Sequence, residues 1–354
     1  MNRIIKSKKI LITGSCGSIG KKLIDALLDN ENNAPSLILG LDNSENGIFI
    51  QDQKYHDNDK VHFRLCDIRE KSQLAEYFKD IDIVFHLAAL KHVAVCEKSP
   101  QQAIMTNIRG IQNIIDVSKE NNVSRVIFTS SDKAVNPTNV MGASKLMGER
   151  LITAANHASS SKTIFASIRF GNVLGSNGSV IPIFFNQIKK NTAITLTSKE
   201  MTRFVMTIKN AVDLILESTS LAKGGEIFIC KMPVLNINEL AQAMILKFSP
   251  NKKNPIKIIG SKPGEKEYEE LMTSEECRRT IELKDMLCIT PALKSMYHKV
   301  NFKYPNQVKA PARKPYISSE EKRLSKKEIL SLLDIDDLFD NLNDHQTERY
   351  WPGD

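Results

Sequence analysis

A glycine-rich turn near the start of the chain constrains its fold more than any other stretch. The run Lys9-Ile10-Leu11-Ile12-Thr13 predicts a short buried strand, and a helical pattern follows over residues 21–28. Between them lies Gly14-Ser15-Cys16-Gly17-Ser18-Ile19-Gly20. In such a turn the first glycine permits a tight bend, the second lets backbone N–H groups approach a pyrophosphate, and the third lets helix and strand pack closely. The strand–turn–helix context therefore favours a dinucleotide-binding turn over an ordinary glycine-rich loop.

An acidic residue follows the next predicted strand, over residues 36–41. Asp42 lies about 20 residues past the glycine turn, where a carboxylate accepts hydrogen bonds from a ribose 2′-OH and repels a 2′-phosphate. The residues after it are Asn43, Ser44 and Glu45, with no Arg. We therefore favour NAD over NADP, with NADP kept as the alternative. A helix-capping Asp without a ligand role is the other interpretation.

Strands and helices alternate along the first half of the chain. Strands are predicted over 61–66, 81–87, 125–129 and 163–170, and a long helical pattern covers 100–121. This alternation predicts an α/β fold with a Rossmann-type, doubly wound parallel sheet. Small residues after the strand at 81–87 would let a cofactor lie against the backbone. The expected cofactor-binding residues are Gly14, Ser15, Gly17, Ser18, Ile19, Gly20, Asp42, Asp67, Ile68, Ala88 and Ala89.

The stretch from Ser130 to Lys145 gathers the chemistry of the chain. It follows the buried strand at 125–129, contains Asp132 and Lys133, and breaks at Asn136-Pro137. A predicted helix then places Met141 and Lys145 on one face, four residues apart. An acid and two amines can therefore converge at the carboxyl edge of the sheet. A charged loop after a core strand is the alternative.

The second half of the chain has the pattern of a smaller, mixed α/β lobe. The helix that begins at Ser179-Val180 could attract phosphate at its N-terminus, and Arg203 suits diphosphate oxygens. The polar stretch from Lys262 to Glu270 is expected to enter a helix. A capping box at Ser325 predicts a short C-terminal helix. We expect a dinucleotide-binding domain over 1–172 with some later segments returning to it, a mainly substrate-binding lobe over 173–300, and an extension over 301–354.

Composition excludes several classes of protein. The 354 residues include no apolar run of the roughly 20 residues that span a membrane, and the net charge of +8 indicates a solvated surface more than a nucleic-acid site. The six cysteines are scattered, as expected of a reduced cytoplasmic protein. His92 and Cys96 lie four apart but lack a second metal-binding pair, so no metal is expected, and His86 is interpreted as a satisfied strand residue.

The motifs together resemble a known family. The glycine turn and Lys145 are typical of the extended short-chain dehydrogenase/reductase superfamily. Five further stretches and Pro263-Gly264-Glu265-Lys266 resemble the UDP-N-acetylglucosamine 4,6-dehydratases, in their short soluble form, over residues 8–335. Those five stretches span 88–93, 131–145, 169–173, 201–204 and 224–228.

The resemblance implies a redox-neutral lyase reaction. Hydride leaves sugar carbon 4 for NAD(P)⁺, the proton on carbon 5 becomes acidic, water is lost across carbons 5 and 6, and hydride returns to carbon 6. The product is a UDP-4-keto-6-deoxy-amino sugar for surface polysaccharide or glycan synthesis. Residues 229–233 and 316–319 look closer to members that invert carbon 5. A homo-oligomer is also implied.

The resemblance assigns roles to individual residues. Asp132 would be the acid at carbon 6 and Lys133 the base at carbon 5. Lys145 would hold the cofactor ribose, and the Ser131 hydroxyl would hydrogen-bond a sugar oxygen. The residues implied for substrate binding are Lys91, Asn172, Val180, Arg203 and Glu265.

Met141 departs from the superfamily pattern, which places Tyr four residues before the Lys. A thioether cannot accept a proton, so another group must take the proton from the carbon-4 hydroxyl. Our hypothesis is that Asp132 does so and then acts as the acid at carbon 6. An epimerase or reductase on the same fold, or a non-catalytic nucleotide-binding scaffold, are the alternatives.

Overall fold

The computed structural model describes residues 4–29, 33–157, 162–176, 178–249, 254–261, 263–297, 300–308, 314–335 and 338. They fall into two compact units. The first comprises 1–170, 212–231 and 272–315, and the second comprises 171–211, 232–271 and 316–354. The chain therefore crosses between the units several times. Residues 212–231 and 272–300, which the sequence placed mainly in the substrate lobe, belong to the first unit.

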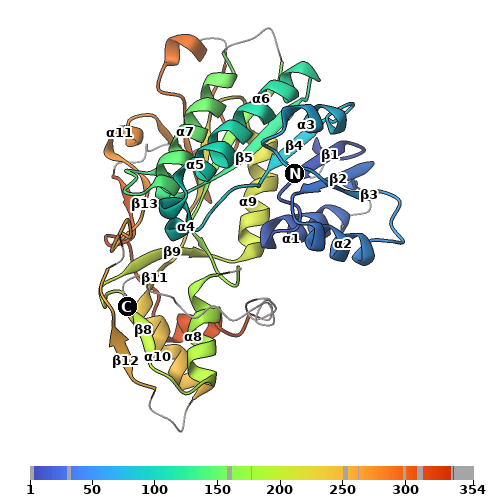
Figure 1. The fold of residues 1–354 in the computed structure, drawn as a ribbon. Coiled ribbons are helices and arrows are strands. Elements are labelled where there is room, and N and C mark those ends of the chain that lie inside the picture. Colours follow the sequence, from blue (N-terminus) through green and yellow to red (C-terminus); the bar gives the residue numbers. More distant parts are fainter. Residues whose placement is uncertain are drawn as a thin grey trace. The chain divides into compact units, whose positions relative to one another are not determined.

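A nine-stranded sheet forms the centre of the first unit (Figure 1), in the order β14-β15-β10-β6-β5-β4-β1-β2-β3. Neighbouring strands from β3 across to β10 are parallel, and β15 and β14 add to this sheet in antiparallel pairs. The predicted doubly wound parallel sheet is confirmed. Its strands are β1 Lys9–Thr13, β2 Leu37–Asp42, β3 Val61–Leu65, β4 Ile83–His86, β5 Arg125–Ser131, β6 Ile164–Phe170, β10 Ile227–Cys230, β14 Thr280–Glu282 and β15 Met286–Ile289.

The strand order reverses at β1, which lies between β2 and β4. In an open α/β sheet, ligands bind outside the carboxyl ends of the strands at this switch point. The glycine turn follows β1 and Ala88 follows β4, so the two loops meet at that edge. The predicted cofactor residues are therefore clustered by the topology of the sheet.

Helices cover both faces of this sheet. In Figure 1, α3, α6 and α7 lie side by side over one face, and α1, α2 and α9 lie on the other. Apolar residues of the first group pack with β1, β4 and β5 in one buried core. The helices of this unit are α1 Ser18–Leu28, α2 Glu45–Lys54, α3 Lys71–Tyr77, α4 Val93–Lys98, α5 Pro100–Ala103, the π-helix η3 Ile104–Arg109, α6 Gly110–Glu120, the 3₁₀ turn η4 Asp132–Ala134, α7 Val140–Ala155, α9 Ile208–Leu221, α11 Ser274–Cys277 and the 3₁₀ turn η5 Lys294–Tyr297, with α9 starting in the second unit.

The second unit has its own core, formed by α8, α10 and α12 around short strands. A three-stranded sheet has the order β11-β9-β7, and two further pairs are β12-β8 and β13-β16. Its elements are β7 Asn172–Val173, α8 Val180–Lys189, β8 Ile194–Leu196, β9 Thr202–Met206, β11 Val234–Asn236, α10 Ile237–Phe248, β12 Ile256–Ile258, β13 Glu270–Met272, β16 Tyr316–Ile317 and α12 Lys326–Leu332.

Three sequence expectations about this half of the chain have definite outcomes. The capping box is confirmed, because Ser325 and Glu328 cap α12 reciprocally. The polar stretch that ends at Glu270 enters strand β13 rather than a helix, and Lys262 lies outside the described residues. Strand β10, expected in the smaller lobe, pairs with β6 in the large sheet.

Candidate active site

The glycine turn is packed too tightly for side chains. Gly14 has φ +71, and a Cβ there would lie 2.8 Å from the backbone nitrogen of Ala88. A Cβ on Gly20 would lie 2.5 Å from the Gly14 carbonyl oxygen. Helix α1 begins at Ser18, within the Gly14–Gly20 stretch. The N-terminus of a helix is suited to a pyrophosphate, because helix N-termini favour anions.

The Asp42 carboxylate is oriented by the same turn. Its Oδ2 accepts a hydrogen bond from the Cys16 backbone N–H at 3.0 Å, and its Oδ1 accepts one from the Ser44 N–H at 3.0 Å. Helix α2 is capped by Ser44, so helix capping does not account for Asp42. The acid is fixed at the end of β2, in the position expected for a ribose-binding residue.

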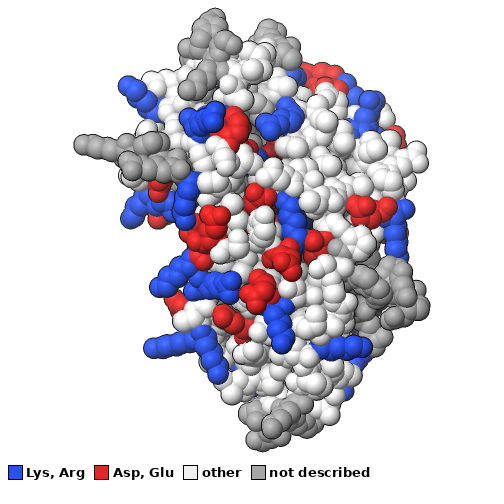
Figure 2. All heavy atoms as spheres, turned by 90° about the vertical axis from the view of Figure 1, so that its left-hand side faces the viewer, with Lys and Arg blue, Asp and Glu red and all other residues white. Residues whose placement is uncertain are grey.

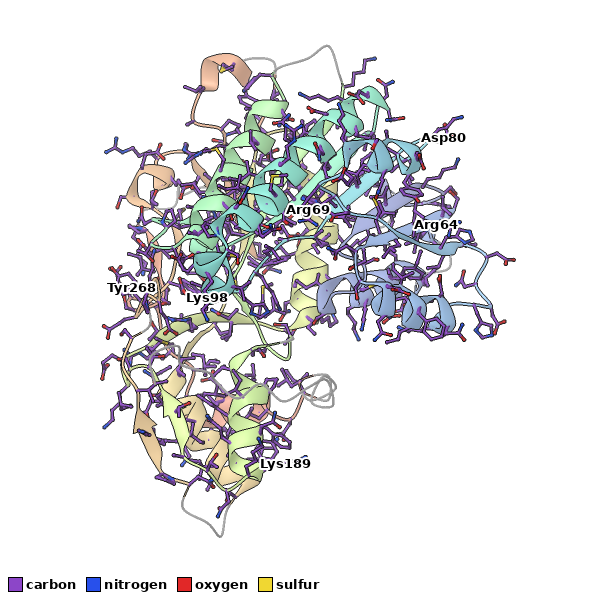
Figure 3. All side chains as sticks on the ribbon, viewed as in Figure 1. Arg64, Arg69, Asp80, Lys98, Lys189 and Tyr268 are labelled. Carbon is purple, nitrogen blue, oxygen red and sulfur yellow. The ribbon has the colours of Figure 1, made fainter. Side chains whose placement is uncertain are left out.

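Asp67 and Ile68 follow β3, and both are held by neighbours. The side chain of Arg69, labelled in Figure 3, donates to both carboxylate oxygens of Asp67 and to Gln102 on α5. The hydrogen bonds from Arg69 lower the pKa of Asp67. Ile68 packs against Gly110, where a Cβ would lie 2.6 Å from its Cδ1. These contacts fix the loop after β3.

The predicted acid and first amine form an ion pair at the end of β5. Asp132 is fully buried, and its Oδ1 accepts hydrogen bonds from the Ser131 hydroxyl at 2.6 Å and from Lys133 Nζ at 3.0 Å. Ser131 also caps the turn η4 by accepting from the Lys133 N–H. The Lys133 side chain is about one-quarter exposed, at 23%. These three neighbouring polar side chains are therefore in contact at the end of β5, and their catalytic roles stay predictions.

Helix α7 is pressed against this turn through a glycine. A Cβ at Gly142 would lie 2.1 Å from the Lys133 carbonyl oxygen, a distance that real Cβ atoms do not adopt. The Asn139 side chain caps the helix by accepting from the Gly142 N–H at 2.8 Å. The absence of a side chain at residue 142 thus sets how closely Lys133 approaches the helix that carries Lys145.

The second amine, Lys145, lies at the same edge of the sheet. Its Nζ donates to the Thr129 carbonyl oxygen at 2.9 Å and lies 4.8 Å from the centre of the Phe128 ring. Burial lowers the pKa of Lys145 to about 8, and the negative charge of Glu149 opposes that shift. An ammonium with a pKa near neutrality changes charge within the working range of an enzyme.

Met141 is buried in an apolar cluster at the position where the superfamily has Tyr. It packs with Cys96 and Ala103, and Leu90, Val93 and Val140 surround them. Burial raises the pKa of the Cys96 thiol, which keeps it protonated. Met141 and Cys96 therefore fill space and offer no group for proton transfer.

Asn107 is a buried residue of the site region that sequence reasoning missed. It lies in the π-helix η3, a rare element that is often found at functional sites. Its side chain pairs with both backbone groups of Leu90 and donates to the Ser144 hydroxyl on α7. It thereby joins the loop after β4 to the helix of Lys145. The available signal in the sequence was Asn107 itself, a polar residue on the apolar face of the helical pattern predicted over residues 100–121.

His86 is a buried strand residue, as expected, but it is only half satisfied, because its Nε2 has no hydrogen-bond partner among the described residues. Its Nδ1 shares a hydrogen bond of 2.7 Å with the Thr13 hydroxyl, and its ring stacks on Phe128. Burial lowers its pKa to about 3, so the ring is neutral. Thr13 in turn accepts from the Ala88 N–H, which ties the strand end to the cofactor turn.

The predicted substrate residues divide between the units. Lys91 lies on the loop after β4 in the first unit and is exposed. In the second unit, Asn172 donates to the Phe204 carbonyl, and Val180 is the first residue of α8. These positions stay predictions for substrate binding.

Arg203 and Glu265 are brought close together within the second unit. Arg203 is buried; it donates to the carbonyl oxygens of Thr202, Lys266 and Glu267, and its Nη2 lies 4.0 Å from Glu265 Oε1. The arginine therefore fixes the loop that bears Glu265. Its role toward a diphosphate is not visible from these contacts and stays a prediction.

Charged side chains of both signs are interspersed on the face shown in Figure 2. This mixture is the solvated surface that the charge pattern predicts. Among the residues that the structure describes, no helix has the length and apolarity that a bilayer crossing needs.

A glycine turn at the switch point and a buried Lys on the helix after β5 define an extended short-chain dehydrogenase/reductase of the Rossmann type. Residues 10–291 match the family described as polysaccharide biosynthesis protein, and the chain belongs to that family. The family match covers the whole parallel sheet and most of the second unit.

Two named relatives and one solved structure are similar to this chain over most of its length. A UDP-N-acetylglucosamine 4,6-dehydratase (inverting) from Campylobacter jejuni is 38% identical over 301 residues, covering 84% of this chain and 87% of the relative. A UDP-glucose 4-epimerase from Rickettsia bellii is 38% identical over 334 residues, covering 92% and 95%. The X-ray structure of Pen from Bacillus thuringiensis has a TM-score of 0.86 and 41% identity, covering 93% and 98%. The chain is therefore an enzyme of the nucleotide-sugar dehydratase and epimerase group.

Proposed function

We propose that this protein is a UDP-N-acetylglucosamine 4,6-dehydratase. The observation that carries the proposal is the ion pair between buried Asp132 and quarter-exposed Lys133, together with a Met in the position of the usual Tyr. An epimerase needs one group that moves a proton at carbon 4. A dehydratase needs two more transfers, at carbons 5 and 6, and an acid–amine pair can provide them.

The first unit fits a nicotinamide dinucleotide. A side chain at Gly14 or Gly20 would collide with backbone, which leaves a bare cradle at the N-terminus of α1. Asp42 would bind the adenosine ribose, which favours NAD over NADP. Lys145 would bind the nicotinamide ribose. When bound, the cofactor supplies an acceptor and donor for hydride.

Asp132 would begin the reaction as a carboxylate, because Lys133 and Ser131 both donate to it. It would take the proton from the carbon-4 hydroxyl as the carbon–hydrogen bond breaks. The same proton would then pass to the carbon-6 hydroxyl, which leaves as water. Asp132 would thus return to its starting state.

Lys133 would remove the carbon-5 proton as a neutral amine. Its link to Asp132 couples the two groups: once Asp132 is protonated, Lys133 has lost its counter-ion and its ammonium form is less favoured. Elimination breaks the carbon-6 oxygen bond and forms the carbon 5–6 double bond. Lys133 would first release its ammonium proton to solvent and would regain its charge by taking the carbon-5 proton. Hydride return to carbon 6, with a proton from solvent to carbon 5 on the opposite face, would then give the inverted 4-keto-6-deoxy product.

The direct test is to incubate purified protein with UDP-N-acetylglucosamine in deuterated water and identify the product by NMR. A 4-keto-6-deoxy sugar with deuterium at an inverted carbon 5 supports the proposal. A product with the same mass as the expected 4-keto-6-deoxy sugar, but with a double bond between carbons 5 and 6 and a hydroxyl on carbon 4, would show that hydride returns to carbon 4 instead of carbon 6. A carbon-4 epimer would identify an epimerase, and binding without turnover would identify a scaffold. UDP-glucose in parallel tests the sugar specificity.

The pathway that would use the product is proposed from the family alone. The family described as polysaccharide biosynthesis protein supports a role in supplying a sugar for a surface polysaccharide or glycan.

A further inference from the structure

A buried ion cluster, formed by Glu149, Arg169 and Glu276, begins one helical turn after Lys145 in α7. The proposed reaction gives these three residues no role. Arg169 on β6 faces two carboxylates at once. Its Nε and Nη2 donate to the two oxygens of Glu149 at 2.8 Å each, and its Nη1 and Nη2 donate to the two oxygens of Glu276 at 2.9 and 2.8 Å. Glu149 and Arg169 are no more than 1% exposed.

Within the Glu149–Arg169–Glu276 cluster, two carboxylates share one guanidinium. Arg279 lies 3.7 Å from Glu276 and also pairs with the exposed Glu275, so it compensates the Glu276 end of the cluster and not the Glu149 end. A buried charge is costly unless a partner compensates it. A further cation is therefore expected close to Glu149.

Lys145 is the candidate for that cation. It precedes Glu149 by four residues in α7, so the two side chains lie on one face of the helix. Both are buried. The Glu149 charge favours the protonated form of Lys145 against the effect of burial.

Other groups that face Lys145 do not supply the charge. The Cys96 thiol, from α4, has a raised pKa and the His86 ring, from β4, a lowered one, so both are neutral. Asp132 and Lys133, on the turn packed against α7, are paired with each other. Glu149 is the carboxylate left to balance the Lys145 ammonium.

The cluster is also rigid. Glu276 takes part in the capping box of α11, where its side chain accepts from the Thr273 N–H at 3.0 Å. Its other contacts hold Arg169, and Arg169 holds Glu149 by two parallel hydrogen bonds, a geometry that fixes orientation as well as distance. The position of the Glu149 carboxylate is thereby fixed by contacts among α7, β6 and α11.

We propose that Glu149 is a positioning residue for Lys145, and that the Glu149–Arg169–Glu276 cluster holds the Lys145 ammonium in its charged form at the cofactor ribose. The inference rests on the cofactor-binding role of Lys145 in the proposed function. It concerns neither the sugar nor the elimination, so cofactor binding alone can test it.

The experiment measures the affinity for NAD⁺ at a series of pH values, by calorimetry without a sugar. In the wild type, binding should weaken as Lys145 loses its proton. In Glu149→Gln the loss should begin about one pH unit lower. The affinity of the variant should then be within about twofold of the wild type near pH 6.5 and roughly five- to tenfold weaker near pH 8.5. Glu149→Asp, which keeps the charge, should recover most of the difference.

Glu226→Gln is the matched control. Glu226 is another fully buried carboxylate of the first unit, and it accepts from Lys223 N–H, Gly224 N–H and the Tyr304 hydroxyl. It precedes β10, at the amino edge of the parallel strands, opposite Lys145. Its removal should lower the melting temperature without moving the pH profile of NAD⁺ binding.

Equal weakening of the Glu149→Gln variant at both pH values would make Glu149 a purely structural residue and overturn the proposal. So would an unchanged profile, or a wild-type affinity that does not depend on pH. If Glu149→Gln does not fold, Glu276→Gln is the variant to test, because it keeps the Glu149–Arg169 pair. It should shift the pH profile of NAD⁺ binding in the same direction by a smaller amount. The absence of any shift would refute the proposal. A failure to convert UDP-N-acetylglucosamine would refute the dehydratase function but leave this binding test unchanged.

Discussion

The Lys133 carbonyl oxygen occupies the space where residue 142 would carry its Cβ, 2.1 Å from the ideal position. The turn η4 and the helix of Lys145 are therefore in contact through a glycine. Any side chain at residue 142 must push the turn η4 away from helix α7. The spacing of the two amines thus depends on a residue that has no chemistry of its own.

Gly142→Ala should disable the site. Alanine favours a helix by up to about 1 kcal/mol over glycine, but this gain cannot offset a collision with backbone. We expect turnover to fall by roughly a hundredfold or more, because misplacement of reacting groups by an ångström has effects of that size. Steady-state kinetics on UDP-N-acetylglucosamine would measure it. Met147→Ala, on the exposed side of the same helix, is the control and should change turnover less than twofold. Wild-type turnover by Gly142→Ala would show that the turn can shift at no cost.

Asp132→Asn should abolish oxidation of carbon 4. The amide keeps the shape of the side chain but cannot accept the hydroxyl proton, and such general-base losses cost roughly 10²–10⁴-fold. The measurement is the single-turnover appearance of reduced nicotinamide by its absorbance. Ser131→Ala removes a hydrogen bond to Asp132 and should lower the rate by roughly tenfold. Oxidation at the wild-type rate in Asp132→Asn would transfer the role of base to another group.

The clustering of the candidate cofactor residues could be predicted from sequence because its signals are local. The glycines, Asp42 and the strand ends lie in the order that a βαβ unit requires, and the sheet brings them to one edge. The Asp132–Lys133 pair is likewise local, since the residues are adjacent. Contacts between distant residues could not be predicted in this way. Arg169 and Glu276 are 107 residues apart, and no periodicity links them.

The units could not be delimited either. Residues 212–231 and 272–315 return to the first unit because β10, β15 and β14 extend its sheet. Short apolar strands such as Ile227–Cys230 fit either unit equally well by pattern. Only the pairing of β10 with β6 decides where the strand belongs.

The ionisation of Lys145 should appear in the stability of the protein. Burial lowers the pKa of Lys145 from its ordinary value of 10.5 to about 8. Between those values the unfolded chain binds a proton that the folded chain does not, so stability from this group rises with pH. Relative to Lys145→Met, the wild type should gain about 2 kcal/mol in free energy of unfolding from about pH 7.5 to about pH 10. Urea unfolding of both proteins at each pH measures the difference. A constant difference would mean that Lys145 titrates at its ordinary pKa.

Met141 should be replaceable by another apolar residue of similar volume. In the cluster with Cys96 and Ala103 its thioether only fills space, and volume-conserving swaps usually cost less than about 1.5 kcal/mol. Met141→Leu should therefore keep turnover within about fivefold of the wild type, as measured by product formation. Met141→Tyr must fit a larger ring into the same cluster, which typically costs about 1–3 kcal/mol. If Asp132 takes the carbon-4 proton, the added phenol should not speed the single-turnover oxidation. A faster oxidation in Met141→Tyr, with Asp132→Asn still active in that background, would show that a phenol at residue 141 reaches the carbon-4 hydroxyl and would contradict the expectation that the ring only fills space.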